Sequence, residues 1–470
     1  MLRVHLAEAR DSWTAWAGVS LTFVVVNAAL VLPALILASG IVAVAEGRLD
    51  FTGSAAFTAV PVLLIVMVCF VAFPVISSST RLVVDSRRGA LARLALAGAA
   101  PGQVRRVVQS QLAIVSLACA VAGSAIGAAL LRPMLDLTNY AQRNEPLWVR
   151  VDPVYSPVAA LVAVAACVVV ALVGGTRQAS AASRIPPVEA LRQSQAPEAS
   201  TRLRAGGWVA LVLLVVVAVG SFASVPFQAA HRYKETVSNL MILGFLQSFV
   251  WGALIAVLGP VVVRPLTAAW TRLVPSTDPG WLLARATVSV RADRLYRSVT
   301  PVLFCVGIAI SDLGVMGSLA ASLEASMPGM DMGAADLSGF VMVFGLPLAV
   351  AFAGAIGSLL MMSRQRDAEL ALLGIAGATG NLRLRIPVLE AVIITVTATI
   401  LALGMVVPGY AFGAFALPAV GLLWVPVFPV LPILAVVAAC LVIMVAATVL
   451  PTLPARRIPE PRVIARLVAE

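Results

Sequence analysis

The chain has 470 residues, of which 61% are hydrophobic and only 12% are charged. Soluble domains are about 45–50% apolar and about 25% charged, so the composition excludes an ordinary soluble protein and indicates many membrane spans. A net charge of +11 is compatible with nucleic-acid binding, but the arginines lie beside apolar runs, which favours a role in membrane orientation and no nucleic-acid partner.

Residues for catalysis and metal binding are scarce. The five cysteines lie singly in different apolar runs, and His5 and His231 are the only histidines. The sequence therefore predicts no metal site, no disulfide framework and no Ser-His triad.

A membrane span needs about 20 mostly apolar residues. Ten runs meet this requirement, grouped along the chain as four, two and four. Their approximate ranges are 17–43, 57–80, 107–131, 156–176, 207–224, 239–263, 299–321, 339–363, 387–409 and 431–452.

The basic residues predict the orientation of these spans. With the N-terminus inside, 27 of the 33 Arg and Lys residues fall on the inner side and 6 on the outer side. Because inner loops of membrane proteins are enriched in Lys and Arg, both termini are expected in the cytoplasm.

A charged segment occurs twice, at 87–111 and 366–390, with an offset of 279 residues that aligns Gly98 with Gly377. Each copy lies between two apolar runs, so we expect two hairpins on the cytoplasmic side. We call the hairpin around Gly98 elbow 1 and the hairpin around Gly377 elbow 2. In each, the glycine is suited to the left-handed position that ends a helix.

The helix that follows is expected to begin at Pro101 in elbow 1, and in elbow 2 Asn381 is a possible N-cap. Leucines spaced three or four residues apart give each elbow an apolar stripe, which either contacts a partner or lies on the inner leaflet.

The repeat extends to the outer surface. Residues 148–154 and 424–430 share five of seven positions, and each predicts either a short extended segment or an interfacial anchor before a span. Residues 184–192 and 457–466 predict amphipathic helices on the inner surface. Residues 280–297 predict a further amphipathic helix, either on the inner surface or solvated in the cytoplasm.

The fold class expected is an all-α polytopic membrane protein with ten transmembrane helices. Two four-helix units start six spans apart, an even number, so they are parallel repeats with a central helix pair between them. The expected boundaries are 1–192 for the first unit, 193–280 for a linker and the central pair, and 281–470 for the amphipathic helix and the second unit.

Elbow 2 resembles the FtsX-like permease domain. The matching residues are Arg366, Glu369 to Leu373, Gly377 to Thr379, and Glu390. Elbow 1 is a weaker match because Ala90, Ala100 and Gln111 replace the Glu, Thr and second Glu. Residues 187–192 match the segment after the fourth span, and the resemblance covers both four-span units.

The resemblance implies the membrane subunit of an ABC transporter of the mechanotransmission class, without enzymatic activity of its own. It implies a cytoplasmic ABC ATPase partner, probably in two copies, which binds ATP and Mg; the permease itself needs no cofactor. The ATPase-contact residues it implies are Arg87, Arg88, Leu91, Leu94, Gly98, Arg366, Glu369, Leu373, Gly377 and Thr379. A phosphate-binding loop requires a lysine, and the only lysine here is Lys234, in an outer loop.

The ten-span arrangement is similar to the permeases of antimicrobial-peptide-resistance transporters of the bacterial plasma membrane. Those permeases carry a large extracytoplasmic domain between spans seven and eight, whereas here that gap is only residues 322–338. The expected function is export or extraction of a hydrophobic or amphipathic compound, such as an antimicrobial peptide or a lipid, or signalling across the membrane.

Asp312 lies near the middle of span seven, where a carboxylate is expensive. It either has a substrate or coupling role or makes a structural hydrogen bond. The alternative function is therefore an ion-coupled secondary carrier that uses Asp312, which the shortage of intramembrane charge disfavours. A membrane enzyme lacks any catalytic constellation.

Overall fold

The computed structural model describes residues 13–48, 51–86, 98–141, 150–182, 205–231, 236–290, 292–326 and 337–449, in some places as backbone alone. Within these ranges every regular element is an α-helix, and no strand occurs. The helices are α2 (Trp13–Ala45), α3 (Phe51–Ser86), α5 (Pro101–Ala141), α6 (Pro157–Ala182), α7 (Ala205–His231), α8 (Thr236–Leu273), α9 (Pro279–Val290), α10 (Ala292–Ser326), α11 (Leu337–Ile375), α12 (Gly380–Ala419) and α13 (Val430–Val449).

Eight helices in the described ranges are long and apolar enough to cross a membrane. They coincide with eight of the ten expected spans. The expected fourth and eighth spans correspond to shorter apolar stretches, Pro157–Val173 in α6 and Val343–Ser358 in α11. The all-helical membrane class is confirmed, and the number ten stays a prediction.

The chain divides into two compact units. Unit 1 takes in residues 1–196 together with Val343–Gly357, and unit 2 takes in residues 197–342 and 358–470. The helices α7 and α8, expected between two repeats, fall in unit 2 with α10 and α12.

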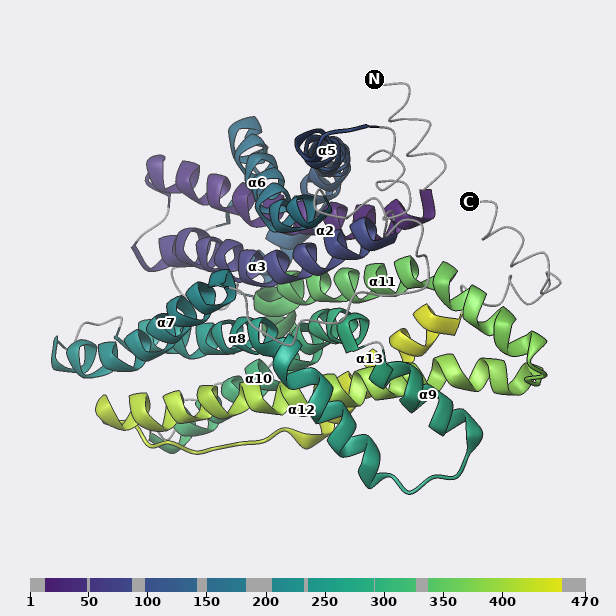
Figure 1. The fold of residues 1–470 in the computed structure, drawn as a ribbon. Coiled ribbons are helices and arrows are strands. Elements are labelled where there is room, and N and C mark those ends of the chain that lie inside the picture. Colours follow the sequence, from purple (N-terminus) through teal and green to yellow (C-terminus); the bar gives the residue numbers. More distant parts are fainter. Residues whose placement is uncertain are drawn as a thin grey trace. The chain divides into compact units, whose positions relative to one another are not determined.

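Unit 1 is built around α2, which packs on α3, α5 and α6 (Figure 1). The approach of α5 to α2 is closest at Gly123, where an added Cβ would lie 2.5 Å from the carbonyl oxygen of Val24. Asn27 of α2 donates to the carbonyl of Ala120 at 2.6 Å, so a buried polar bond accompanies this contact. The expected role of the Gly123–Gly127 pair in close helix packing is confirmed.

A stretch of α11 completes unit 1. Thr22 of α2 donates to the carbonyl of Ala353 at 3.5 Å. A Cβ on Gly357 would lie 2.5 Å from the carbonyl oxygen of Gly18, and one on Gly354 would collide with Val75 of α3. Small residues thus allow α11 to pack closely on two helices of the first repeat.

Unit 2 has α10 and α12 at its centre, with α8 against both of them (Figure 1). Helix α7 packs on α8, and Gln247 of α8 bonds to Ser221 of α7. Helix α13 packs on α10 and α12, and the Sγ atoms of Cys305 and Cys440 lie 3.3 Å apart between α10 and α13.

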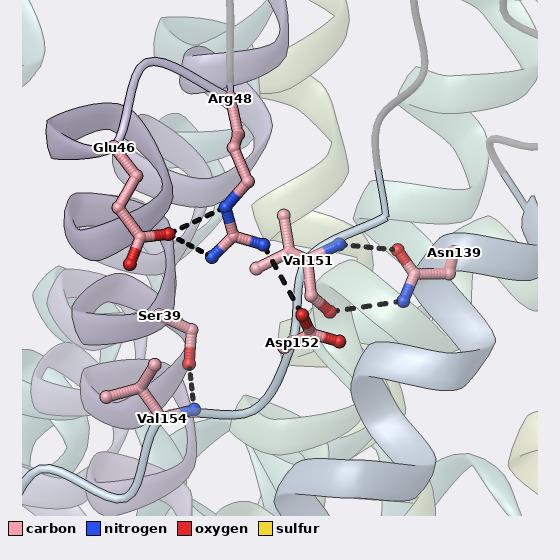
Figure 2. A network of polar contacts seen from close by, with 7 residues as sticks. All are labelled: Ser39, Glu46, Arg48, Asn139, Val151, Asp152 and Val154. Atoms are coloured by element: carbon pink, nitrogen blue, oxygen red, sulfur yellow. Dashed lines mark hydrogen bonds and ion pairs between the residues drawn. The ribbon is translucent and has the colours of Figure 1, made fainter.

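The expected extended segment of unit 1 is present at residues 150–156, and we call it strap 1. Figure 2 shows how it is tied to α2 and α5. The backbone N–H of Val154 donates to Ser39 of α2 at 2.9 Å, and Asn139 of α5 makes two 3.4 Å bonds with the backbone of Val151. Arg48 bridges to Asp152 at 3.3 Å.

The matching segment of unit 2 is residues 422–429, which we call strap 2. Three serines of α10, four residues apart, accept its alternate backbone N–H groups at 2.8 to 2.9 Å, in the pairs Ser318 with Val427, Ser322 with Val425, and Ser326 with Leu423. Four helical residues rise about 6 Å and two extended residues rise about 6.6 Å, so the two spacings match. The extended conformation expected for both straps is confirmed in the parts described.

Candidate functional site

Elbow 2 joins α11 to α12 by a tight, fully bonded turn. The backbone N–H of Ala378 donates to the carbonyl of Leu373 at 2.9 Å, and that of Gly377 donates to Gly374 at 3.0 Å. These two bonds define a Schellman helix end, which requires a left-handed residue at Gly377. Gly377 has φ 90°, so the role expected for this glycine is confirmed.

Elbow 1 has the same backbone conformation at the equivalent position, where Gly98 has φ 91°. An added Cβ at Gly98 or Gly377 would meet nothing within 4 Å. Glycine is therefore required at both positions by backbone conformation, because space for a side chain is available.

The N-cap of α12 is Thr379, whose side chain accepts the N–H of Leu382 at 3.4 Å. Asn381 was the expected N-cap, and that expectation is wrong. Thr379 has the extended conformation of a cap, with φ −64° and ψ 154°, whereas Asn381 already lies inside the helix. An N-cap must precede the first helical residue, which here is Gly380.

Elbow 1 begins its second helix with the opposite half of the same capping arrangement. Helix α5 starts at Pro101 as expected, and the side chain of Gln103 accepts the backbone N–H of Ala100 at 2.9 Å. A complete capping box pairs a Ser or Thr cap with a Glu or Gln three residues later. Ala100 and Gln103 supply the second half, and Thr379 and Leu382 supply the first.

The surface of elbow 2 differs from the expected stripe. Leu373 is half-buried, whereas Leu372 and Ile375 are 58% and 61% exposed. These two residues lie three apart on the last turn of α11, so they form an apolar patch that we call the elbow 2 patch. Their hydrophobicity was visible in the sequence, but the spacing pattern selected their neighbours.

The other expected contact residues are placed only in part. Arg87, Arg88, Leu91 and Leu94 lie outside the described residues. Arg366 and Glu369 lie in α11, and their side chains are not described. Gly98, Gly377 and Thr379 shape the turns themselves.

Helix α9 lies against the first turns of α12. A Cβ on Gly280 would lie 3.4 Å from Leu382 and 3.5 Å from Leu389. Trp281, Ala284 and Val288 are buried at helical spacing, so one face of the expected amphipathic helix is covered by protein. The indole ring of Trp281 packs edge-on against Trp270 of α8 at 6.2 Å.

The start of α9 carries a second feature near elbow 2. Asp278 caps the helix by accepting the N–H of Trp281 at 3.3 Å, and it lies 3.7 Å from Arg385 of α12. Asp278, Arg385 and three apolar residues of α12 line an open pocket of about 600 Å³, the apolar residues being Leu384, Val388 and Leu389. The beginning of α12 is thus fixed to α9 on one side and open on another.

Asp312 lies away from the elbows, fully buried in α10. Its Oδ1 atom lies 2.8 Å from the hydroxyl of Ser248 in α8. This contact shows a hydrogen bond, one of the two roles expected, and it does not exclude the other.

The comparisons agree with this geometry. Residues 62–187 match the family model described as FtsX-like permease C-terminal, a range that includes Gly98 and the start of α5. A comparison with curated proteins gives no match. Together with its many apolar helices, the match confirms the resemblance drawn from the sequence: the chain is a multi-pass membrane protein with an FtsX-like permease domain, a domain of transporter membrane components.

Proposed function

We propose that this protein is the permease subunit of an ABC transporter whose ATPase is a separate polypeptide that contacts both elbows. The observation that carries the proposal is the pair of matched elbows, 279 residues apart, each turned by a left-handed glycine. The family match over elbow 1 supports it.

The elbows are suited to transmit force because they are short and their backbone groups are bonded. In elbow 2 the Schellman bonds end α11 and Thr379 caps α12. Few free dihedral angles remain between the two helices, so a push on the turn moves both helix ends together. Helix α12 extends from the elbow to strap 2 and carries that movement across the bilayer.

Helix α9 adds a lever to elbow 2. Because its buried face packs on the first turns of α12, movement of α12 displaces α9 as well. Helix α9 is separated from α10 by a single residue, so α12 and α10 are coupled at this end of unit 2.

The proposed location is the bacterial plasma membrane, with both elbows and both termini in the cytoplasm. The excess of arginine in the segments next to the elbows supports this orientation. Two ATPase subunits, one for each elbow, would bind ATP and Mg, and one permease chain would suffice for the pair.

The proposed substrate is a hydrophobic or amphipathic compound taken from the membrane, such as an antimicrobial peptide or a lipid; transmembrane signalling uses the same movement. The short connections of the described outer segments support a membrane-borne substrate. Strap 1 is only 150–156, and α2 and α3 are joined by residues 46–50.

Co-purification with the ATPase tests the proposal. The variant Leu372→Asp plus Ile375→Asp places two charges in the elbow 2 patch, and Leu94→Asp plus Leu373→Asp changes the residues expected from the sequence. Asn381→Asp is the matched control, because it adds one charge to the same elbow at an exposed position without removing apolar surface.

Loss of the ATPase in the patch variant, with retention in the control, is the expected result. Full retention of the ATPase by both double variants would show that the contact assignment is wrong.

A further inference from the structure

Three helices of unit 2 meet at a buried polar cluster. Ser248 of α8, and Ser311 and Asp312 of α10, each have no exposed surface. Ser248 lies 2.8 Å from Asp312 Oδ1 and 2.7 Å from the hydroxyl of Ser311. Ser311 in turn lies 3.4 Å from the backbone carbonyl oxygen of Met405 in α12.

The hydrogens in this cluster can be counted. Three oxygen–oxygen contacts run in series from Asp312 through Ser248 and Ser311 to the Met405 carbonyl. The two hydroxyl groups supply one hydrogen each, and the carbonyl supplies none. An ionised Asp312 leaves one of the three contacts without a hydrogen, whereas a protonated Asp312 supplies the third.

The other carboxyl oxygen favours the same protonation state. Asp312 Oδ2 is buried and has no hydrogen-bond partner among the described residues. An anionic oxygen buried without a donor or a cation is far more costly than the unpaired carbonyl oxygen of a neutral acid, which costs about 1–3 kcal/mol.

The charged groups on the neighbouring helices are distant along those helices. On α8, Arg264 is sixteen residues from Ser248, which is about 24 Å of helix. On α12, Glu390 is fifteen residues from Met405, about 22 Å, and the Tyr410 hydroxyl donates to the carbonyl of Val427. On α10 itself, Glu324 is exposed and twelve residues away.

We propose that Asp312 is a proton-binding site, which holds a proton as a neutral carboxylic acid and donates it into a directed relay from Asp312 to Ser248, to Ser311 and to the Met405 carbonyl. The relay joins α10, α8 and α12, so it fastens α8 to the centre of unit 2. Separation of α8 from α10 removes the acceptor of the Asp312 proton and opens the site to release it.

Infrared spectroscopy of the purified full chain in lipid nanodiscs at neutral pH tests the site without the ATPase, so its failure is distinct from failure of the proposed function. The difference between the native chain and Asp312→Asn is expected to contain the carbonyl stretch of a protonated carboxylic acid. In deuterated water this band shifts to lower frequency.

Ser248→Ala tests the relay. It removes the acceptor of the Asp312 proton, so the carbonyl band is expected to move to higher frequency, while Ser311→Ala keeps that acceptor and gives a smaller shift. These two variants retain Asp312 and report on the site even if Asp312→Asn fails to fold.

Glu324→Gln is the control on the same helix, and its difference spectrum is expected to show loss of carboxylate bands alone. Carboxylate bands in place of the acid band for Asp312→Asn would overturn the proposal. A band that Ser248→Ala leaves unmoved would overturn the relay.

Discussion

Ser39 and Ser318 lie 279 residues apart and make the same two hydrogen bonds in their separate units. Each donates to the carbonyl four residues earlier, Leu35 at 2.9 Å and Gly314 at 2.8 Å. Each accepts a strap N–H at 2.9 Å, from Val154 and Val427 respectively. The offset is that of the elbows, so the repeat joins the inner turns and the outer straps in one pattern.

Removal of either serine hydroxyl is expected to destabilise its unit. Ser318→Ala and Ser39→Ala leave a strap N–H without its acceptor, which costs about 1–3 kcal/mol when the group is buried. The apparent Tm of the purified protein should fall in both variants. Ser289→Ala on exposed α9 is the control, because its hydroxyl bonds only within its own helix; a Tm for Ser318→Ala equal to that of this control would contradict the role of strap 2.

Substitution of the elbow glycines tests backbone conformation separately from packing. Gly98→Ala and Gly377→Ala force a side chain into a left-handed residue, at a cost of roughly 1–2 kcal/mol. Gly102→Ala is the matched control, since it also has no neighbour within 4 Å but lies in α5 with a helical backbone.

Thermal unfolding should rank Gly98→Ala below Gly102→Ala. The opposite order would mean that the turn of elbow 1 tolerates a different conformation.

The divided capping box predicts a gain as well as a loss. Thr379→Ala removes the cap of α12 and should cost about 1 kcal/mol. Ala100→Thr gives elbow 1 the missing half of the box, because Gln103 is already in place, and should raise the apparent Tm. A lowered Tm for Ala100→Thr would show that the cap position of α5 lies elsewhere.

The two cysteines between α10 and α13 predict a specific cross-link. The Sγ atoms of Cys305 and Cys440 are 3.3 Å apart, and a disulfide requires about 2.05 Å. Treatment with copper phenanthroline should join the two helices, seen as two fragments held together after proteolysis between them. Cys305→Ser should abolish the product, and its persistence in that variant would place another cysteine in the pair.

Local features of the site could be predicted from the sequence because their causes are local. Gly98 and Gly377 follow leucine-rich helical stretches, and only glycine readily adopts the conformation that ends such helices. The straps were expected from proline and alternation at Val425 to Val430. Thr379 was missed as a cap because Asn381 has an equally suitable side chain one turn position later.

Long-range features could not be predicted in the same way. The glycines Gly354 and Gly357 indicate close packing, but a small residue does not specify which helix approaches it, and these pack on the first repeat. The serines of α10 resemble ordinary helix residues until the spacing of strap 2 is known. The elbow 2 patch was missed because exposure at a helix end depends on which face α12 and its neighbours cover.

The central claim is that both elbows lie on the cytoplasmic side and contact a separate ATPase. Its most direct test is labelling of single cysteines at Gly102 and Asn381, both exposed, in a chain without its five native cysteines. A third single cysteine at Tyr155, exposed on strap 1, marks the outer side.

With a membrane-impermeant maleimide, Tyr155→Cys should react in intact cells, and the two elbow cysteines only after the membrane is opened. Bound ATPase should then protect both elbow cysteines. Reaction of either elbow cysteine in intact cells, or full reactivity of both with the ATPase bound, would contradict the account.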